Sequence, residues 1–342
     1  MKPNGLNGEF IVIGENIHTT RIVLRQGKLI TTFDDGREAV RYTTAAGETR
    51  YLPIPDDFKR RQDYEEGRVK HVMIAIRDAM TGGGEGMIYL RALIDKQVKA
   101  GADYLDLNVD EISLKLNEQI AAIEWLVKTV ESLSPVPVAV DSSNLEILRA
   151  GLAVCEGRAG RPMLNSASLE RLDALDTASK HGLPVVVTAA GESGMPQDDE
   201  ARVLNASRMV DAAVERGLPL EDLYVDPLVF PISVDGAFGN HCLDAIRKLR
   251  ARYGPAIHIS GGLSNVSFGL PCRKLINEVF LNLAVDAGAD SGIVDPVAND
   301  LNKVFAADKQ AGPYKLAEDM LLGRDRNCRN FLRAYRKGEL GQ

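Results

Sequence analysis

Cysteine is scarce in this sequence, and the few that occur form no recognisable pattern. The four cysteines, Cys155, Cys242, Cys272 and Cys328, lie far apart along 342 residues. No pair has the CxxC spacing that is typical of zinc-binding and redox-active sites, and no disulfide framework is indicated. We therefore expect reduced thiols.

Positive charge and long hydrophobic runs are also lacking. The formal net charge is −7 at pH 7, and no basic patch is interleaved with aromatic residues, which argues against a nucleic-acid partner. No apolar run approaches the roughly 20 residues that a membrane span requires, and the first ten residues show no secretion signal. We expect a cytoplasmic protein with no membrane and no nucleic-acid partner.

The sequence instead alternates short apolar segments with amphipathic ones, and 45% of its residues are hydrophobic. Segments typical of buried strands occur at residues 10–13, 104–110, 136–144, 162–168, 183–196, 222–233, 256–259 and 291–296. Each is followed by a helical pattern, and eight such units predict an α/β protein, a (β/α)8 TIM barrel. An open doubly wound sheet is the competing fold, but no segment resembles a polar edge strand.

Two segments lie outside this alternation. We expect a single domain over residues 1–342, with an insertion after the first strand at about 21–84 and a helical C-terminal extension at about 311–342. The insertion alternates apolar and polar residues around turn signals, which indicates hairpins, and it ends in a helix.

The insertion leaves the barrel after the first strand, so it should emerge on the catalytic face. There its basic residues could form a rim that docks or caps a partner protein. The alternative is that it packs against the side of the barrel or pairs two subunits. The basic residues are Arg21, Arg25, Arg37, Arg41 and Arg50.

Aspartate and asparagine dominate the positions where predicted strands end. These positions include Glu15, Asn16, Asp106, Asn108, Asp141, Asn165, Asp226, Ser264 and Asn265. His and Lys are almost absent there, which argues against a His-rich metal site, a Schiff-base lysine and a phosphate site, and we expect no bound metal. Neither a GxGxxG sequence after a strand nor a P-loop occurs, so dinucleotide binding is not indicated.

Carboxylates and amides in this number suit a flat heterocycle that carries N–H donors and a carbonyl, such as a 2-amino-4-oxopyrimidine. A single aspartate would be explained better as a helix cap, but several at equivalent positions favour a ligand. Gly261 and Gly262 would let such a ligand approach the main chain closely. Asn265 follows them, either as a ligand-binding amide or as a residue that tolerates a left-handed turn.

Six short motifs together resemble the pterin-binding methyltransferases. These are GEN at 14–16, LDLNV at 105–109, VDSSN at 140–144, LNSAS at 164–168, YVDPLVFPIS at 224–233 and GLSNVSF at 262–268. The resemblance covers about residues 9–20 and 85–310. It is to the methyltetrahydrofolate:corrinoid protein methyltransferases and the folate domain of cobalamin-dependent methionine synthase.

This resemblance implies an enzyme that moves a methyl group, in either direction, between N5 of tetrahydrofolate and the cobalt of a corrinoid. The alternatives are a dihydropteroate synthase-like pterin enzyme and a non-catalytic folate-binding subunit. Tetrahydrofolate or 5-methyltetrahydrofolate would be the substrate. The chain has no DxHxxG segment for cobalamin, so a corrinoid protein or free cobalamin would supply the corrinoid, and we expect a homodimer.

The resemblance also implies residue roles. Asp141, Asn165 and Asp226 would hold the pterin ring, and Asn265 would contact it near N5. A water held by Asp226 or Asp141, or bulk solvent, would supply the proton at N5, so the predicted catalytic residues are Asn265, Asp226 and Asp141. The remaining predicted folate-binding residues are Glu15, Asn108, Gly262, Ser264 and Arg273. The family often carries Arg where this chain has Asn16, so the local charge at the first strand is expected to differ from that of the family.

Overall fold

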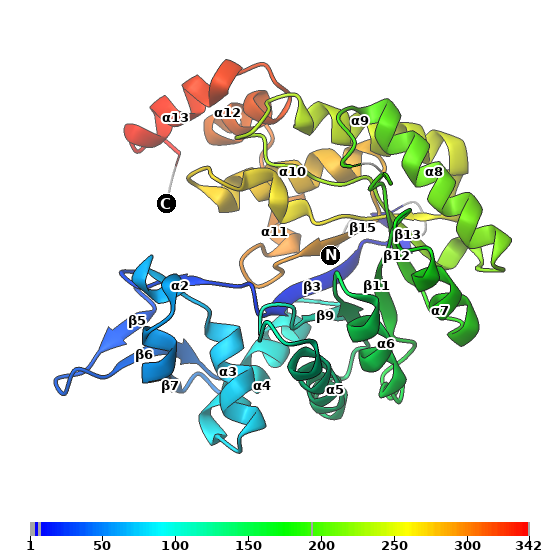
Figure 1. Ribbon diagram of the computed structural model, residues 1–342. Helices are drawn as coiled ribbons and strands as arrows, with labels where there is room; N and C mark the ends of the chain where they lie inside the picture. The colour runs from blue at the N-terminus through cyan, green and yellow to red at the C-terminus, as the bar shows by residue number, and fades with distance from the viewer. Residues whose placement is uncertain (1–3, 6–7, 193, 341–342) are drawn as a thin grey trace. The chain divides into compact units, whose positions relative to one another are not determined.

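A computed structural model of the protein describes residues 4–5, 8–192 and 194–340. Within these residues, eight strands form one sheet in the order β14-β13-β12-β11-β10-β9-β3-β15. The strands are β3 (Ile11–His18), β9 (Tyr104–Asn108), β10 (Val138–Asp141), β11 (Met163–Ala167), β12 (Val185–Thr188), β13 (Leu223–Asp226), β14 (His258–Ile259) and β15 (Ser291–Val294) (Figure 1).

The strands pair in parallel, as in β9 with β10 and β12 with β13. A parallel bridge between Gly262 and Ile293 brings the two ends of the strand order, β14 and β15, together. The valines of β12, residues 185–187, have no solvent exposure, as expected for strands covered on both faces. The expected (β/α)8 barrel is confirmed.

Helices follow the barrel strands along the chain. They are α4 (Gly84–Lys99), α5 (Leu116–Leu133), α6 (Leu145–Ala153), α7 (Asp173–His181), α8 (Asp199–Glu215), α9 (Phe238–Tyr253) and α10 (Arg273–Ala287). Short 3-10 helices occur at η1 (Leu220–Asp222), η2 (Gly254–Ala256), η3 (Leu263–Ser267) and η4 (Arg326–Cys328). In the described part of the chain, no helix combines the length and apolarity needed to cross a bilayer.

The C-terminal tail is helical, as expected, with α11 (Leu301–Phe305), α12 (Gly312–Leu321) and α13 (Arg329–Arg336). At the other end, β1 (Asn4–Gly5) and β2 (Gly8–Glu9) form an antiparallel pair. Contacts divide the chain into two compact units. Unit 1 is Met1–Ile13 with Leu164–Gln342, and unit 2 is Gly14–Met163.

The expected insertion follows β3 and lies in unit 2. It contains β4 (Val23–Leu24), β5 (Ile30–Thr32), β6 (Glu38–Thr43), β7 (Thr49–Pro53), α1 (Asp56–Lys59), α2 (Gln62–Glu65), β8 (Arg68–Val69) and α3 (His71–Met80). Strands β5, β6 and β7 form an antiparallel sheet, which Figure 1 shows in blue beside α3 and α4. Arg50 and Tyr42 of this sheet bond Glu85 of α4 at 2.7 and 2.5 Å.

One boundary differs from the sequence prediction. The first barrel strand does not end at Ile13 but continues to His18, so Glu15 and Asn16 lie within it. Gly14 allows this continuation, because a Cβ there would come within 2.5 Å of Gln97 Oε1. That same oxygen accepts the backbone N–H of Asn16 at 3.0 Å.

Candidate functional site

Asp141 ends β10 and is held by its neighbour strand. Its Oδ2 accepts a hydrogen bond from Asn108 Nδ2 of β9 at 2.9 Å, and Asn108 Oδ1 accepts the backbone N–H of Asp110 at 2.9 Å. Parallel register places Asp141 directly beside Asn108. Two of the predicted folate-binding side chains are therefore in contact in unit 2.

The other polar residues of the VDSSN motif have structural partners. Ser142 Oγ donates to Asp110 Oδ1 at 2.5 Å, and the backbone N–H and hydroxyl of Ser143 donate to Asp110 Oδ2, each at 3.0 Å. Asn144 caps α6, since its Oδ1 accepts the N–H of Glu146 at 2.8 Å. The helix-cap explanation holds for Asn144, whereas Asp141 remains available for a ligand.

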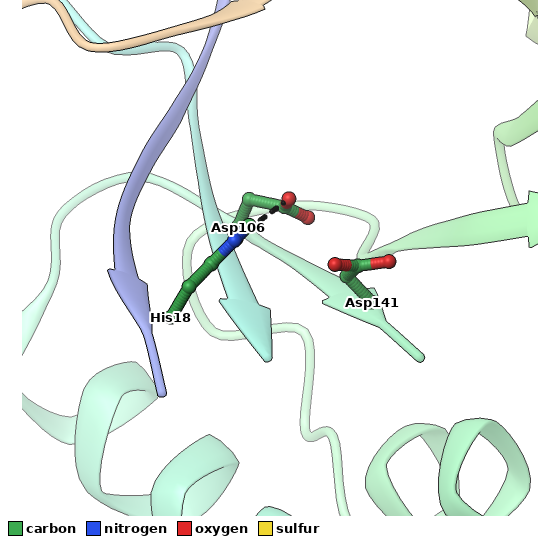
Figure 2. A group of neighbouring side chains, drawn as sticks. All are labelled: His18, Asp106 and Asp141. Carbon is green, nitrogen blue, oxygen red and sulfur yellow. Dashed lines mark hydrogen bonds and ion pairs between the residues drawn. The ribbon is translucent and has the colours of Figure 1, made fainter. Parts of the chain in front are cut away.

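His18 and Asp106 lie next to Asp141. Figure 2 shows the three side chains projecting from neighbouring strands of unit 2, with the imidazole of His18 turned toward Asp106. His18 Nε2 and Asp106 Oδ2 are 2.9 Å apart, and polar atoms of all three side chains lie within 4.8 Å of one another. The spacing would suit a divalent cation, but the hydrogen bond engages the atoms that a cation would need. We therefore assign the three groups as a charge network, and the absence of a metal stays a prediction.

Burial perturbs the acid–base properties of this network. The pKa of Asp141 is raised to about 7, first by burial and then by the negative charge of Asp106, while His18 acts in the opposite direction. Burial lowers the pKa of His18, but its hydrogen bond to Asp106 and the nearby carboxylates outweigh burial and raise that pKa. A partly buried carboxyl whose pKa is raised toward neutral pH is typical of functional sites.

Glu15 is also on β3, and its Oε1 lies 3.6 Å from Arg21 Nη1. This ion pair supplies positive charge near the first strand, where the family motif would place an arginine instead of Asn16.

Asp226 ends β13 in unit 1 and is buried. Its Oδ1 accepts the backbone N–H of Leu228 at 2.7 Å, and the backbone N–H of Gly262 is a second donor to the carboxylate. Burial raises the pKa of Asp226 to about 6, although these N–H groups and the charge of Arg202 oppose the rise. The carboxylate is positioned by main-chain donors.

The turn that carries Asn265 packs against this carboxylate. Gly261 has φ +151°, and a Cβ there would lie 2.9 Å from Asp226 Oδ1. A Cβ on Gly262 would lie 2.8 Å from Asn265 Nδ2. The two glycines therefore leave room for these two side chains beside the main chain, while close approach of a ligand there stays a prediction.

Asn265 lies inside η3 and has no left-handed backbone angle, so the turn-residue explanation is wrong. Within the residues that the structure describes, its side-chain amide makes no hydrogen bond. Arg273 braces this turn, because its Nε donates to Ser267 Oγ at 2.9 Å and its Nη2 to the carbonyl of Ser264 at 3.0 Å. The guanidinium carbon also lies 4.4 Å from the ring centre of Phe268.

Asn165 is buried in β11, in register with Val186 of β12. Two strands away in the sheet, Asp226 occupies the end of β13. The predicted residues thus fall into two sets, Glu15, Asn108 and Asp141 in unit 2, and Asn165, Asp226, Gly262, Ser264, Asn265 and Arg273 in unit 1. Their roles toward a ligand stay predictions.

Sequence reasoning missed His18 and Arg202. His18 was overlooked because the first strand was expected to stop at Ile13; the apolar Ile17, fully buried in the structure, was the signal for a longer strand. Arg202 lies on α8 without exposure to solvent, and nothing in an amphipathic helix pattern marks a buried arginine.

Comparison with known proteins places the chain in a family. A family model described as pterin binding enzyme matches residues 88–295. The methylcorrinoid:tetrahydrofolate methyltransferase of Eubacterium limosum is 32% identical over 276 residues, 78% of this chain and 93% of that protein. A methionine synthase of Mycobacterium leprae (strain TN) is 32% identical over 213 residues, 58% of this chain but only 17% of that protein.

Solved structures of dihydropteroate synthases share the fold. The Stenotrophomonas maltophilia enzyme has a TM-score of 0.51 at 22% identity and covers 65% of this chain and 86% of its own. A Xanthomonas albilineans enzyme has a TM-score of 0.52 at 20% identity, with 65% and 84% covered. These likenesses show the barrel alone. The family match and the identity across most of the chain show more: the chain belongs to the pterin-binding methyltransferase family.

Proposed function

We propose that this protein transfers a methyl group between N5 of tetrahydrofolate and the cobalt of a corrinoid. Membership in the family supports this function, as does the activity for which the Eubacterium limosum relative is named, methylcorrinoid:tetrahydrofolate methyltransferase. Either direction of transfer is compatible with the site, because the same N5–methyl bond is formed or broken.

The observation that carries the proposal is the pairing of Asp226 with the Asn265 turn. A buried carboxylate with main-chain donors on one side is suited to accept N–H bonds from the aminopyrimidine edge of a pterin. The amide of Asn265, which makes no hydrogen bond to any residue that the structure describes, follows on the turn that packs against that carboxylate. One group recognises the ring and the other is free to bond a reacting atom.

The chemistry needs a group that can follow a change of charge at N5. When the methyl carbon leaves N5 for cobalt, the N5–C bond breaks, its electron pair stays on nitrogen, and N5 takes up a proton. An amide can donate to or accept from N5 by rotating, without ionising itself. Asn265 would therefore stabilise N5 before and after transfer.

The other assignments follow the same logic. We assign Asp141, Asn165 and Asp226 to the pterin ring, with Asp141 and Asp226 as candidates to hold the water that exchanges the proton with N5. The folate-binding set is completed by Glu15, Asn108, Gly262, Ser264 and Arg273.

The corrinoid enters as a substrate, and a partner corrinoid protein or free cobalamin would deliver it. The corrinoid supplies the cobalt that accepts or donates the methyl group. We also propose a homodimer, the commonest symmetric assembly, which sedimentation analysis would test. The proposed cytoplasmic location is open to cell fractionation.

A visible-spectrum assay tests the function directly. The protein is mixed anaerobically with 5-methyltetrahydrofolate and Co(I) cobalamin, and the expected result is protein-dependent loss of the Co(I) spectrum with formation of methylcobalamin. Folate binding without turnover on free or protein-bound corrinoid would instead indicate a non-catalytic subunit. Condensation of a pterin pyrophosphate with aminobenzoate, without methyl transfer, would indicate a dihydropteroate synthase.

A further inference from the structure

His18, Asp106 and Asp141 bring three ionisable groups together on adjacent strands of unit 2. His18 is the last residue of β3, Asp141 is the last of β10, and Asp106 lies on β9 between those strands (Figure 2). The imidazole and Asp106 are joined at 2.9 Å, and the third group lies within 4.8 Å. The function proposed above uses Asp141 but assigns no role to the other two.

Charges in this position interact strongly because little water screens them. Asp106 has no solvent exposure. Two ionised carboxylates at this spacing repel each other, so one of them tends to take up a proton. A protonated imidazole bonded to Asp106 offsets that repulsion.

We propose that His18, held by Asp106, is a positioning residue that keeps Asp141 ionised and thereby able to accept hydrogen bonds from the N–H groups of a bound pterin. This inference rests on the proposed function for the identity of the ligand. A neutral Asp141 would present a hydroxyl donor to those N–H donors, and binding would weaken. His18 thus acts on the ligand through the carboxylate beside it.

Other charged groups around the network do not replace His18. Glu15, on the same strand, adds negative charge and is paired with Arg21 at 3.6 Å. Asp110, after β9, also disfavours ionisation of Asp141, and its oxygens are bonded by Ser142 and Ser143. Both carboxylates increase the need for a positive charge next to Asp141.

The first measurement requires no folate. The chain has five histidines, so ring resonances in an NMR titration of the full chain can be assigned, and His18→Gln identifies the signal of His18. We expect His18 to titrate above the ordinary range for histidine. Asp106→Asn and Asp141→Asn should each lower that midpoint by about one pH unit or more. An unchanged midpoint in both variants would overturn the proposal.

The second measurement is tetrahydrofolate affinity by calorimetry between pH 5.5 and 8.5. Binding should weaken as acid protonates Asp141. His18→Gln removes the positive charge beside Asp141. The pH midpoint at which tetrahydrofolate binding weakens should therefore rise by about one pH unit. Asp106→Asn should move it downward, because Asp106 acts on Asp141 more strongly than His18 does. If His18 had only a structural role, His18→Gln would weaken tetrahydrofolate binding equally at every pH and leave the midpoint unchanged. That result would contradict the proposal.

The chain offers a matched control in His258, whose Nδ1 lies 3.0 Å from Asp290 Oδ2. His258 is the first residue of β14 rather than the last of a strand, so His258→Gln should leave the midpoint unchanged. A stoichiometric metal ion in the dialysed protein would also overturn the proposal. If the protein bound no folate but the His18 midpoint still responded to Asp106→Asn and Asp141→Asn, the proposed function would be overturned. If the protein bound folate but the His18 midpoint did not respond to those changes, this inference alone would be overturned.

Discussion

At the scale of single residues, Asn265 and Asp226 combine opposite properties. Asn265 is neutral at every relevant pH and its amide makes no bond in the described part of the chain. Asp226 is buried, ionisable and held by main-chain N–H groups. Asn265 is suited to bond a ligand atom whose charge changes during the reaction. Asp226 is suited to accept hydrogen bonds from the N–H donors of a ligand in a fixed position.

Replacement of Asn265 by alanine should slow methyl transfer by about 10- to 100-fold, the range for one hydrogen bond that is strongest in the transition state. Folate affinity should fall less, because the ring is held elsewhere. Two measurements check this prediction: the rate of methyl transfer from 5-methyltetrahydrofolate to Co(I) cobalamin, and the folate affinity by calorimetry. Asn117→Ala, at an exposed position of α5, is the control, and an unchanged rate for Asn265→Ala would contradict its role.

Replacement of Asp226 by asparagine should weaken folate binding at least about tenfold and yet stabilise the free protein. The folded pKa of about 6 lies above the ordinary value near 3.8. The unfolded chain therefore ionises first as pH rises, and stability falls between about pH 4 and 6. At pH 7 the variant should gain on the order of 1–3 kcal/mol in the free energy of unfolding.

Urea denaturation at pH 4 and pH 7 checks this prediction, since the gain should disappear at pH 4. A loss of stability at pH 7 would show that the carboxylate is held more favourably than its burial indicates.

At the scale of secondary-structure elements, α8 supports the end of β13 through Arg202. Its Nε donates to the carbonyl of Leu228 at 3.3 Å and its Nη1 to the carbonyl of Asp198 at 3.0 Å. Leu228 has φ +68°, an unfavourable angle for leucine, and its N–H holds Asp226. Arg202 therefore braces a strained turn that positions the site carboxylate.

Arg202→Met should destabilise the protein by about 1–3 kcal/mol, because the part-buried carbonyls of Leu228 and Asp198 lose the guanidinium as a donor. Folate affinity should also fall, since the turn that holds Asp226 is released. The control on the same helix is Arg208→Met, which breaks an exposed pair with Glu192 at 3.0 Å and should cost at most about 1 kcal/mol. Equal effects of the two changes in thermal melts and calorimetry would exclude a special role for Arg202.

At the scale of the whole molecule, the insertion after β3 is the main departure from a plain barrel. Several of its arginines are engaged within unit 2: Arg25 pairs with Glu38, Arg37 with Asp35 and Arg50 with Glu85. Arg50 and Tyr42 attach the small sheet to α4. These contacts favour packing beside the barrel, while docking of a corrinoid protein, within a single-domain chain, remains our proposal for the segment.

Replacement of residues 22–80 by a short linker distinguishes these roles. If the insertion docks a corrinoid protein, turnover with that protein should fall much more than turnover with free cobalamin. Arg50→Gln is the companion variant, because it weakens the attachment to α4 and leaves the segment present. Equal losses with both forms of the corrinoid, or no loss, would exclude docking.

Much of the fold was predictable because it depends on local pattern. The apolar run at residues 185–187 is typical of a strand covered on both faces. A polar residue that follows such a run, as Asp226 does, is expected at a strand end. The assignment of Asp141, Asn165 and Asp226 to a pterin came from motif resemblance, which specifies a family more sharply than composition does.

The sequence by itself determined the barrel, the insertion after its first strand, the helical tail and the aspartates and asparagines at the strand ends. Only the tertiary structure decided that β3 reaches His18, that His18 meets Asp106 across 88 residues of sequence, and that Arg202 is buried behind Leu228. The reason is physical. Hydrophobic periodicity depends on residues that are neighbours in the sequence, whereas burial and pKa depend on groups that folding brings together from distant parts of the chain.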